Sequence, residues 1–414
     1  MDVFFVSRLG ADAVAAVGLT ESLLAIVYTV AMGLSIGVAA TVARRVGEHD
    51  LEGAASTAVQ GIALGLVVAL LFGLGGFLFA PRLLEAMGAS PSVVAIGTGY
   101  TRIMLSGNAA IMLLFLINAI FRGAGDAAIA MRVLWFANAI NIVLGPCLIF
   151  GVGPFPEMGV AGAATATTFG RTMGVAVQLY ALARKSERVR ILARHLRLIP
   201  GVMWQLVRLS GTGMFQVLVG TASWIGLVRV LSTFGSDALA GYTISIRVIL
   251  FTLLPAWGLS NAAATMVGQA LGAKKPERAE AAVWMAGRFN LLFLGSVGVL
   301  YFAFAPWIIS AFSDSPAVHE YGVEGIRIIS LGFPMYAWGM VLTQSFNGAG
   351  DTWTPTLINI GCFWCWEIPL ALVLSNHFGL GPRGVFIAIA VAFSTLAIVS
   401  AILFRRGKWK TRKV

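Results

Sequence analysis

Charged residues are scarce in this chain: they make up 11% of its 414 residues, whereas 58% are hydrophobic, and the mean hydropathy is +0.87. A soluble domain carries about 25% charged residues, which cover its surface in water. The shortage excludes an ordinary soluble domain and indicates a protein that is surrounded by lipid.

Cysteine and histidine are also few, with three and four residues. Cys362 and Cys365 form an isolated pair, whereas a structural zinc site needs four ligands. The sequence shows no Ser/His/Asp set and no H-E-x-x-H pattern. We therefore expect no cofactor, no structural metal site and no catalytic residues. An integral-membrane enzyme is the least favoured alternative.

What the chain has instead is a series of apolar runs, many of them longer than the roughly 18–20 residues that cross a bilayer core. Backbone groups must be paired in hydrocarbon, and runs without period-two alternation form helices rather than barrel strands. The sequence thus predicts an all-α polytopic membrane protein with about eleven transmembrane helices. The expected spans are, roughly, 13–43, 53–80, 93–121, 128–151, 160–183, 204–232, 239–268, 281–311, 322–346, 355–378 and 384–405.

A six-residue phrase occurs twice, as Phe121-Arg-Gly-Ala-Gly-Asp126 and Phe346-Asn-Gly-Ala-Gly-Asp351, 225 residues apart. The same spacing matches other stretches without a gap, such as Gly33-Leu-Ser35 with Gly258-Leu-Ser260. One register over about 150 positions indicates a duplicated unit. We expect the phrase itself to be a tight turn, in which glycine ends one helix and aspartate caps the next.

The duplication predicts two homologous lobes of six helices each, in parallel, with a pseudo-twofold axis along the membrane normal. Residues 1–184 form the N-terminal lobe, 185–203 a basic linker, 204–406 the C-terminal lobe with helices 7–12, and 407–414 a basic tail. The first helix of the second copy, shifted back by 225, would lie mostly before Met1. We therefore interpret the N-terminal lobe as a stub of helix 1 followed by helices 2–6, and we expect the natural start to lie upstream.

Lysine and arginine gather in alternate connectors, in the linker and in the tail, which together carry most of the 29 basic residues. The positive-inside rule then places the linker and the C-terminus in the cytoplasm. We expect a multi-pass protein of the inner membrane. The net charge of +11 lies beside the membrane spans, where anionic lipid is a simpler partner than nucleic acid. We expect no nucleic-acid binding and a monomer.

Several motifs resemble those of the MATE (multidrug and toxic compound extrusion) transporters. They include the stretch from Asp2 to Gly18, Gly123-Ala-Gly-Asp126, Asn141-Ile-Val-Leu-Gly-Pro146, Gly258-Leu-Ser260 and Ile368-Pro-Leu-Ala371. The resemblance covers essentially the whole chain. It implies export of organic cations, drugs or other amphiphiles in exchange for H⁺ or Na⁺, by alternating access of two lobes that face a central cavity.

Glu367 is the leading candidate for ion coupling. It lies mid-span, two residues before Pro369, which would open the helix backbone. A charge at the bilayer centre costs at least about 2.5–3.5 kcal/mol, so an acid that is retained there is a functional candidate. The alternative is a structural acid that pairs with Arg247 or bonds a freed carbonyl.

Other polar candidates follow from the resemblance. Asp2 is similar to the carboxylate of the first helix in proton-coupled members, and Asn118 and Asn141 are similar to its polar companions. Gly145 stands where other members commonly have an aspartate, which weakens the ion site of the N-terminal lobe. Acids that some members carry in the seventh and tenth helices are not evident.

The aromatic residues Tyr336, Trp364 and Trp366 and the cation Arg247 are candidates for lining the substrate cavity. Such aromatic faces attract organic cations by about 0.5–2 kcal/mol, although such residues are more often interface anchors or packing than ligands. Arg171 and Arg247 lie within spans, where snorkelling or ion pairing explains them as well as substrate contact does. They also hint at an alternative function, a flippase of the same superfamily for a lipid-linked saccharide.

Overall fold

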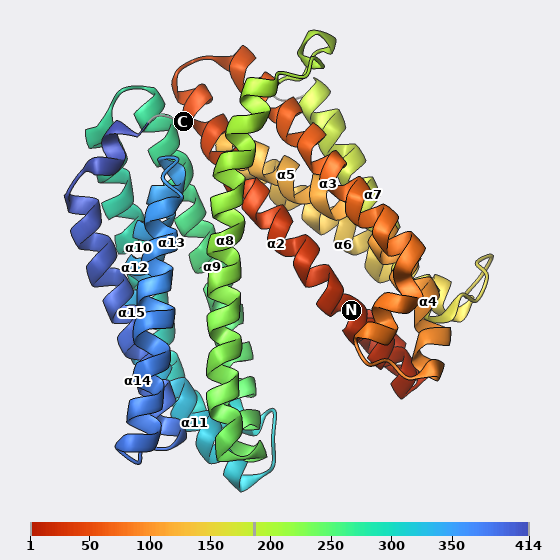
Figure 1. The fold of residues 1–414 in the computed structure, drawn as a ribbon, viewed down its shortest axis with the longest axis vertical. Helices are drawn as coiled ribbons and strands as arrows, with labels where there is room; N and C mark the ends of the chain where they lie inside the picture. The colour runs from red at the N-terminus through yellow and green to blue at the C-terminus, as the bar shows by residue number, and fades with distance from the viewer. Residues whose placement is uncertain (1, 185–187, 413–414) are drawn as a thin grey trace. The chain divides into compact units, whose positions relative to one another are not determined.

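The computed structural model describes residues 2–184 and 188–412, with side chains from Phe4 onward. All regular elements in these ranges are helices (Figure 1). In the first half of the chain they are α1 (Asp2–Val6), α2 (Ala11–Gly47), α3 (Leu51–Ala86), α4 (Pro91–Ser106), α5 (Asn108–Ala124), α6 (Ala127–Phe150) and α7 (Gly159–Arg184). The second half holds α8 (Pro200–Leu231), α9 (Ser236–Gly272), α10 (Pro276–Ser310), α11 (Pro316–Leu331), α12 (Phe333–Gly348), α13 (Trp353–Asn359), α14 (Ile368–Leu372) and α15 (Pro382–Arg405).

The predicted spans all fall on helices. Nine helical segments of the described chain are long and apolar enough to cross a membrane, and ten if the bent pair α11–α12 counts as one span. The bend between α11 and α12 is 56°, at Gly332. The remaining predicted span, 160–183, lies on α7, which has 26 residues but does not meet the same criteria of length and composition.

The chain forms two compact units. Unit 1 comprises Met1–Val46 and Asp50–Met214, and unit 2 comprises Gly47–His49 and Phe215–Val414. Their boundary lies inside α8, whereas the sequence repeat places the lobe boundary in the linker 185–203. The two compact units and the two sequence repeats therefore differ in where they assign the first half of α8. The lobe limits that follow from the repeat stay a prediction.

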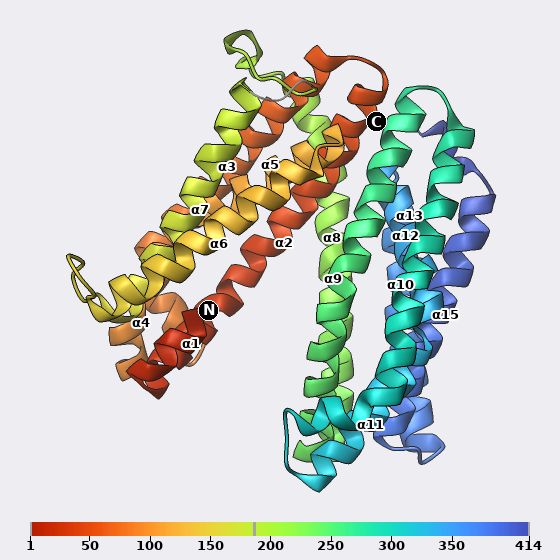
Figure 2. The same ribbon diagram turned by 180° about the vertical axis from the view of Figure 1, so that it is seen from behind.

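The helices follow the sequence repeat element by element. A shift of 225 residues carries α2 onto α9, α3 onto α10, α4 onto α11, α5 onto α12 and α7 onto α15, with ends that agree within a few residues. The same shift carries α6 onto the segment from α13 to α14. Figure 2 shows α2, α3, α5, α6 and α7 of unit 1 running side by side. The tandem duplication is therefore visible in the fold as well as in the sequence.

The twin Gly-Ala-Gly-Asp phrase forms a turn in both units, as predicted. Gly125 and Gly350 have φ values of 86° and 80°, a left-handed conformation that glycine adopts without strain. The capping expectation holds only once: Asp351 accepts hydrogen bonds from the amide (3.3 Å) and the hydroxyl (2.7 Å) of Thr354, whereas Asp126 makes no side-chain cap. The prediction of an aspartate cap was therefore wrong for the first copy.

The first glycine of each phrase has a different role, in helix packing. A Cβ atom on Gly123 would lie 2.8 Å from the carbonyl oxygen of Ala39 on α2. A Cβ atom on Gly348 would overlap the carbonyl oxygen of Ala264 on α9. Ala39 and Ala264 are themselves 225 residues apart, so the same contact between backbones occurs in both copies. Small residues at such contacts allow membrane helices to approach closely.

The basic tail folds back onto unit 2. Trp409 is 1% exposed, and its ring stacks on Phe404 at 4.6 Å between centroids. Lys410 pairs with Glu280 of α10 at 2.7 Å, and Arg412 pairs with Asp351 at 3.4 Å. The described part of the tail thus joins α15, α10 and the second Gly-Ala-Gly-Asp turn.

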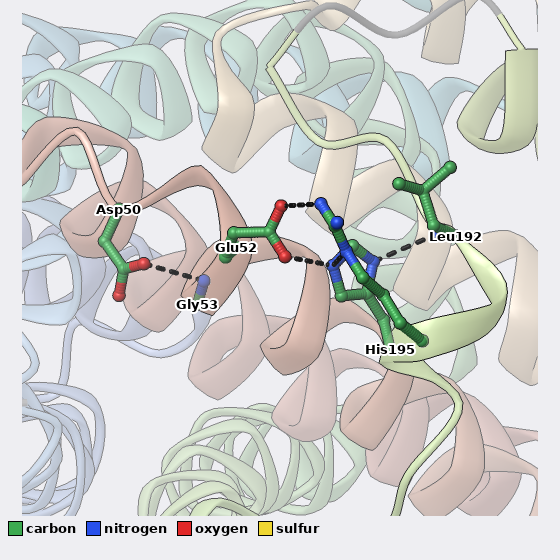
Figure 3. Close-up of polar contacts among 6 residues, drawn as sticks. Asp50, Glu52, Gly53, Leu192 and His195 are labelled. Carbon is green, nitrogen blue, oxygen red and sulfur yellow. Dashed lines mark hydrogen bonds and ion pairs between the residues drawn. The ribbon is translucent and has the colours of Figure 1, made fainter.

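A clamp on α3 holds the end of the linker in unit 1. Glu52 accepts hydrogen bonds from Arg194 and from Nε2 of His195 (2.6 Å), while Nδ1 of His195 accepts the amide proton of Leu192 at 3.0 Å (Figure 3). Because Nδ1 is an acceptor, Nε2 carries the proton that faces Glu52. Gln60, two turns further along α3, donates to the carbonyl of Arg197 (2.8 Å) and accepts from the amide of Ile199 (3.0 Å).

The Gln60 half of the clamp can be tested by proteolysis. Gln60 is fully buried, whereas Arg194 and Arg197 are exposed trypsin sites on the segment that it holds. Gln60→Ala removes two hydrogen bonds, each worth about 0.5–1.5 kcal/mol, so limited trypsin digestion there is expected to be about tenfold faster. Gln205→Ala on α8 is the matched control. Unchanged digestion of the Gln60 variant would show that the clamp does not hold the linker.

Candidate functional site

Glu367 lies at the end of an eight-residue π-helix, Ile360–Glu367, that connects α13 to α14. Its side chain is 3% exposed. Pro369 follows two residues later and has no amide hydrogen, so the backbone ladder cannot run through it unchanged. The opening of the backbone that the sequence predicted takes the form of a π-helix, a geometry that often marks functional sites.

The carboxyl group of Glu367 lies among groups that carry no positive charge. It is within electrostatic range of the phenols of Tyr242 on α9 and Tyr336 on α12 and of the thiol of Cys362. In the described chain no ion pair joins it to any basic side chain, and Arg247, its suggested partner, is exposed on α9. An ionised carboxylate in such surroundings is costly unless a cation or a proton neutralises it.

Unit 1 contains a pocket of about 620 Å³ between α2, α5, α6 and α7. This volume is in the range of ligand sites, which are about 300–1,000 Å³. Apolar residues of α5 and α6, such as Leu114, Phe115 and Leu134, form part of its walls. Its polar lining consists of Glu21, Tyr28, Asn138, Asn141, Thr167 and Arg171.

Two hydrogen bonds order the polar wall of the pocket. Arg171, at the thirteenth of the 26 positions of α7, donates to the hydroxyl of Tyr28 at 3.0 Å. Asn141 donates to the hydroxyl of Thr167 at 2.6 Å. Within the described residues no carboxylate forms an ion pair with Arg171. The pocket therefore holds a mid-helix cation that donates a hydrogen bond to a neutral phenol.

The pocket of unit 1 and the acid of unit 2 occupy the same place in the duplicated fold. Four residues surround or form the acidic site: Tyr242, Tyr336, Cys362 and Glu367. Shifted back by 225, they become Val17, Ile111, Ala137 and Ile142, and all four of these line the pocket. The charge is inverted as well, because Glu367 corresponds to Ile142 and Arg171 corresponds to the buried Leu396.

The structure brings only part of the predicted ion site together. Asn141 lines the pocket, while Asn118 is buried and accepts a hydrogen bond from Gln178 of α7 at 2.6 Å. The side chain of Asp2 lies outside the described residues. A Cβ atom on Gly145 would have Asn141 Oδ1 as its nearest neighbour, at 3.8 Å, so a larger side chain has room to begin there.

The three aromatic residues that were predicted to line the substrate cavity lie in different surroundings. Tyr336 is near Glu367 and stacks on Phe393 at 3.9 Å. Trp364 donates to the carbonyl of Val219 at 2.9 Å and so ties the π-helix to α8. Trp366, like Trp364, is almost half exposed. Sequence reasoning did not identify Tyr28 and Thr167 as pocket residues, and it gave Arg171 too little weight as a binding residue. The mid-span position of Arg171 was a usable signal.

Two copies of one helical unit, which cross the membrane repeatedly and hold charged side chains at mid-span, define a multi-pass membrane transporter. The chain belongs to the MatE family, whose family model matches residues 1–147 and 213–373.

Relatives of this chain include proteins named for multidrug resistance and for transport. A probable multidrug resistance protein NorM of Thermotoga maritima is 27% identical over 426 residues, covering 100% of this chain and 89% of that protein. An FAD transporter of Shewanella oneidensis is 24% identical over 405 residues, with coverages of 98% and 89%.

Solved structures agree with this assignment. A crystal structure of MATE in the straight conformation matches with a TM-score of 0.91 and 26% identity, over 99% of this chain and 92% of that one. A MOP superfamily transporter from Pyrococcus furiosus matches with a TM-score of 0.90 and the same identity and coverages. It is described as having a binding pocket of reverse polarity that suggests a different function.

Proposed function

We propose that this protein is a secondary active exporter, which moves cationic or other amphiphilic small molecules out of the cell in exchange for H⁺ or Na⁺ by alternating access. The single observation that carries the proposal is Glu367. It is a buried carboxyl group, 3% exposed, on an interrupted membrane helix, and no basic side chain of the described chain pairs with it.

The chemistry of exchange follows from this surrounding. A proton, a sodium ion or a cationic substrate can each neutralise Glu367, and binding of one disfavours binding of the next. Substrate and coupling ion therefore compete for one carboxylate, which is the basis of antiport. The phenol groups of Tyr336 and Tyr242 lie within electrostatic range of the same carboxylate.

A flippase for a lipid-linked saccharide is the second candidate. The observation in its favour is Arg171, a cation in the pocket of unit 1 that suits a phosphate group. The relative that is named an FAD transporter is consistent with phosphate-bearing cargo in this family.

We also propose that the protein is a monomer in the inner membrane, with its C-terminus in the cytoplasm and anionic lipid at its basic ends. The orientation and the contact with anionic lipid rest on the distribution of lysine and arginine. It requires no cofactor and no nucleic acid.

The decisive experiment is transport in proteoliposomes under separately imposed H⁺ and Na⁺ gradients, with ethidium as the substrate. One charge that crosses 100 mV provides about 2.3 kcal/mol, and about 1.4 kcal/mol corresponds to a tenfold gradient. We therefore expect one of the two ions to drive ethidium to more than tenfold accumulation. Vesicles without protein and vesicles with an added ionophore are the controls.

Movement of ethidium under neither gradient would contradict export of organic cations. A fluorescent lipid-linked saccharide that crosses the same vesicles would then favour the flippase.

A further inference from the structure

We propose that the pocket of unit 1 is a receptor for the anionic head group, a carboxylate or a phosphate, of an amphiphilic molecule, and that Arg171 binds this group. The inference rests on the proposed transport function, because it names a class of cargo for one lobe. It goes further in assigning a site for negative charge in a protein whose other charged site is an acid.

The position of Arg171 makes it a binding group rather than a surface charge. It stands midway along α7, which packs against the membrane span α6, and its side chain is partly buried. A guanidinium at this depth costs several kcal/mol unless it is neutralised, and such residues mark substrate pathways. Cations near helix ends can extend to the membrane surface by snorkelling. Arg171 is not such a residue, because it lies near the middle of α7, which runs from Gly159 to Arg184.

The bonding of Arg171 leaves it able to take a ligand. A guanidinium has five N–H donors in a planar fork, and one of them is given to the hydroxyl of Tyr28. That bond fixes the side chain toward α2 without neutralising it. The fork matches the two oxygens of a carboxylate or a phosphate, which is the pairing that arginine makes best.

The rest of the pocket suits the remainder of an amphiphile. Asn138 and Asn141 add amide groups, and Phe115 and Leu134 add apolar surface for a hydrophobic body. Glu21 also lines the pocket, so the lining carries an acid as well as the arginine. A permanent cation without an anionic group gains nothing from Arg171.

The duplication supports a specific function for this cation. The two copies share one fold, yet the site equivalent to Arg171 is Leu396, which is 3% exposed in unit 2. An apolar residue therefore satisfies the packing at this position of the fold. A structural need does not explain the arginine, whereas binding of an anion does.

The test is equilibrium binding, without any gradient, of three fluorescent probes that share one dansyl body. They are dansylglycine with a carboxylate, dansylglycinamide without charge and dansylcadaverine with an ammonium group. The purified full chain in lipid nanodiscs is expected to bind dansylglycine about tenfold more tightly than the amide, as a charge-assisted hydrogen bond allows. Arg171→Gln is expected to remove this difference and leave the affinity for the amide within about twofold, since only the charged contact is lost.

Two further variants keep the result interpretable. Arg171→Lys retains the charge and should keep a preference of a few fold for the carboxylate, even if Arg171→Gln folds poorly. Arg132→Gln, an exposed arginine of α6 outside the pocket lining, is the matched control and should bind like the unaltered protein. Competition by octanoate and by octyl phosphate distinguishes a carboxylate from a phosphate preference.

Equal affinity for the three probes, or an unchanged preference in both Arg171 variants, would overturn the proposal. So would a failure of both competitors to displace dansylglycine. These outcomes concern binding alone, so they differ from a failure of the proposed transport, in which probes bind but no gradient moves a substrate.

Discussion

Glu367→Gln is expected to abolish ion-coupled efflux while leaving expression and folding intact. Glutamine keeps the size and hydrogen-bonding capacity of the side chain but can neither release a proton nor neutralise a cation. Because Glu367 is buried and has no ion-pair partner among the described residues, no salt bridge is lost. Ethidium transport under the driving gradient should fall below roughly a tenth of the unaltered rate, since the coupled ion supplies the driving force.

The control for this variant is Glu320→Gln, which removes an exposed acid of α11 in the same unit. It should transport at the unaltered rate. If Glu367→Gln transports normally while it elutes and melts like the parent protein, the carboxyl group is structural and coupling lies elsewhere.

Gly348→Ala is expected to destabilise unit 2 strongly, because the new methyl group would overlap the backbone oxygen of Ala264. A carbonyl of a helix cannot rotate away as a side chain can, so α12 and α9 must separate. Overpacking of this kind costs about 1–3 kcal/mol, and the upper part of that range is expected here. The equivalent Gly123→Ala should cost less, because its contact with Ala39 is the looser of the two, at 2.8 Å.

Thermal unfolding in detergent, followed by tryptophan fluorescence, measures this effect. Gly295→Ala on α10 is the matched control, since a Cβ atom there meets nothing within 4 Å and alanine is the better helix former. That variant should be unchanged or slightly more stable. Equal melting temperatures for Gly348→Ala and Gly295→Ala would show that α12 and α9 are not in contact as described.

The helical fold was predictable because hydrocarbon leaves few choices to a backbone. Long apolar runs must be helices, and a constant offset between Gly123-Ala-Gly-Asp126 and its second copy fixes the register of both units. The turn at Gly125 was also predictable, because the end of a helix often needs a residue with a positive φ and glycine adopts this conformation without strain. The sequence could not separate this role from the packing role of Gly123, since packing depends on a helix 84 residues away in the chain.

The candidate sites were predictable only in part. Glu367 stood out because a mid-span acid is costly wherever its neighbours lie. The meaning of Arg171 depends on Tyr28, 143 positions earlier, and on pocket walls from four helices, which no local pattern joins. The π-helix that ends at Glu367 was also not predictable. Pro369 indicates that the regular helix backbone is interrupted, but it does not indicate which geometry the interruption takes.

The composition of α7 has a consequence for how the protein is made. This helix carries Arg171 at its middle and falls short of the criteria for a membrane span that its neighbour α6 satisfies. A central arginine makes the free energy of translocon-mediated insertion less favourable by about 2.5–3.5 kcal/mol. The insertion of α7 alone into lipid is therefore only weakly favourable. Its extensive packing on α6, through close contacts such as Gly170 with the backbone of Ala137, compensates only when both helices are present. We therefore expect α6 and α7 to enter the bilayer together as a hairpin, in which packing on α6 compensates for the cost of placing Arg171 in lipid.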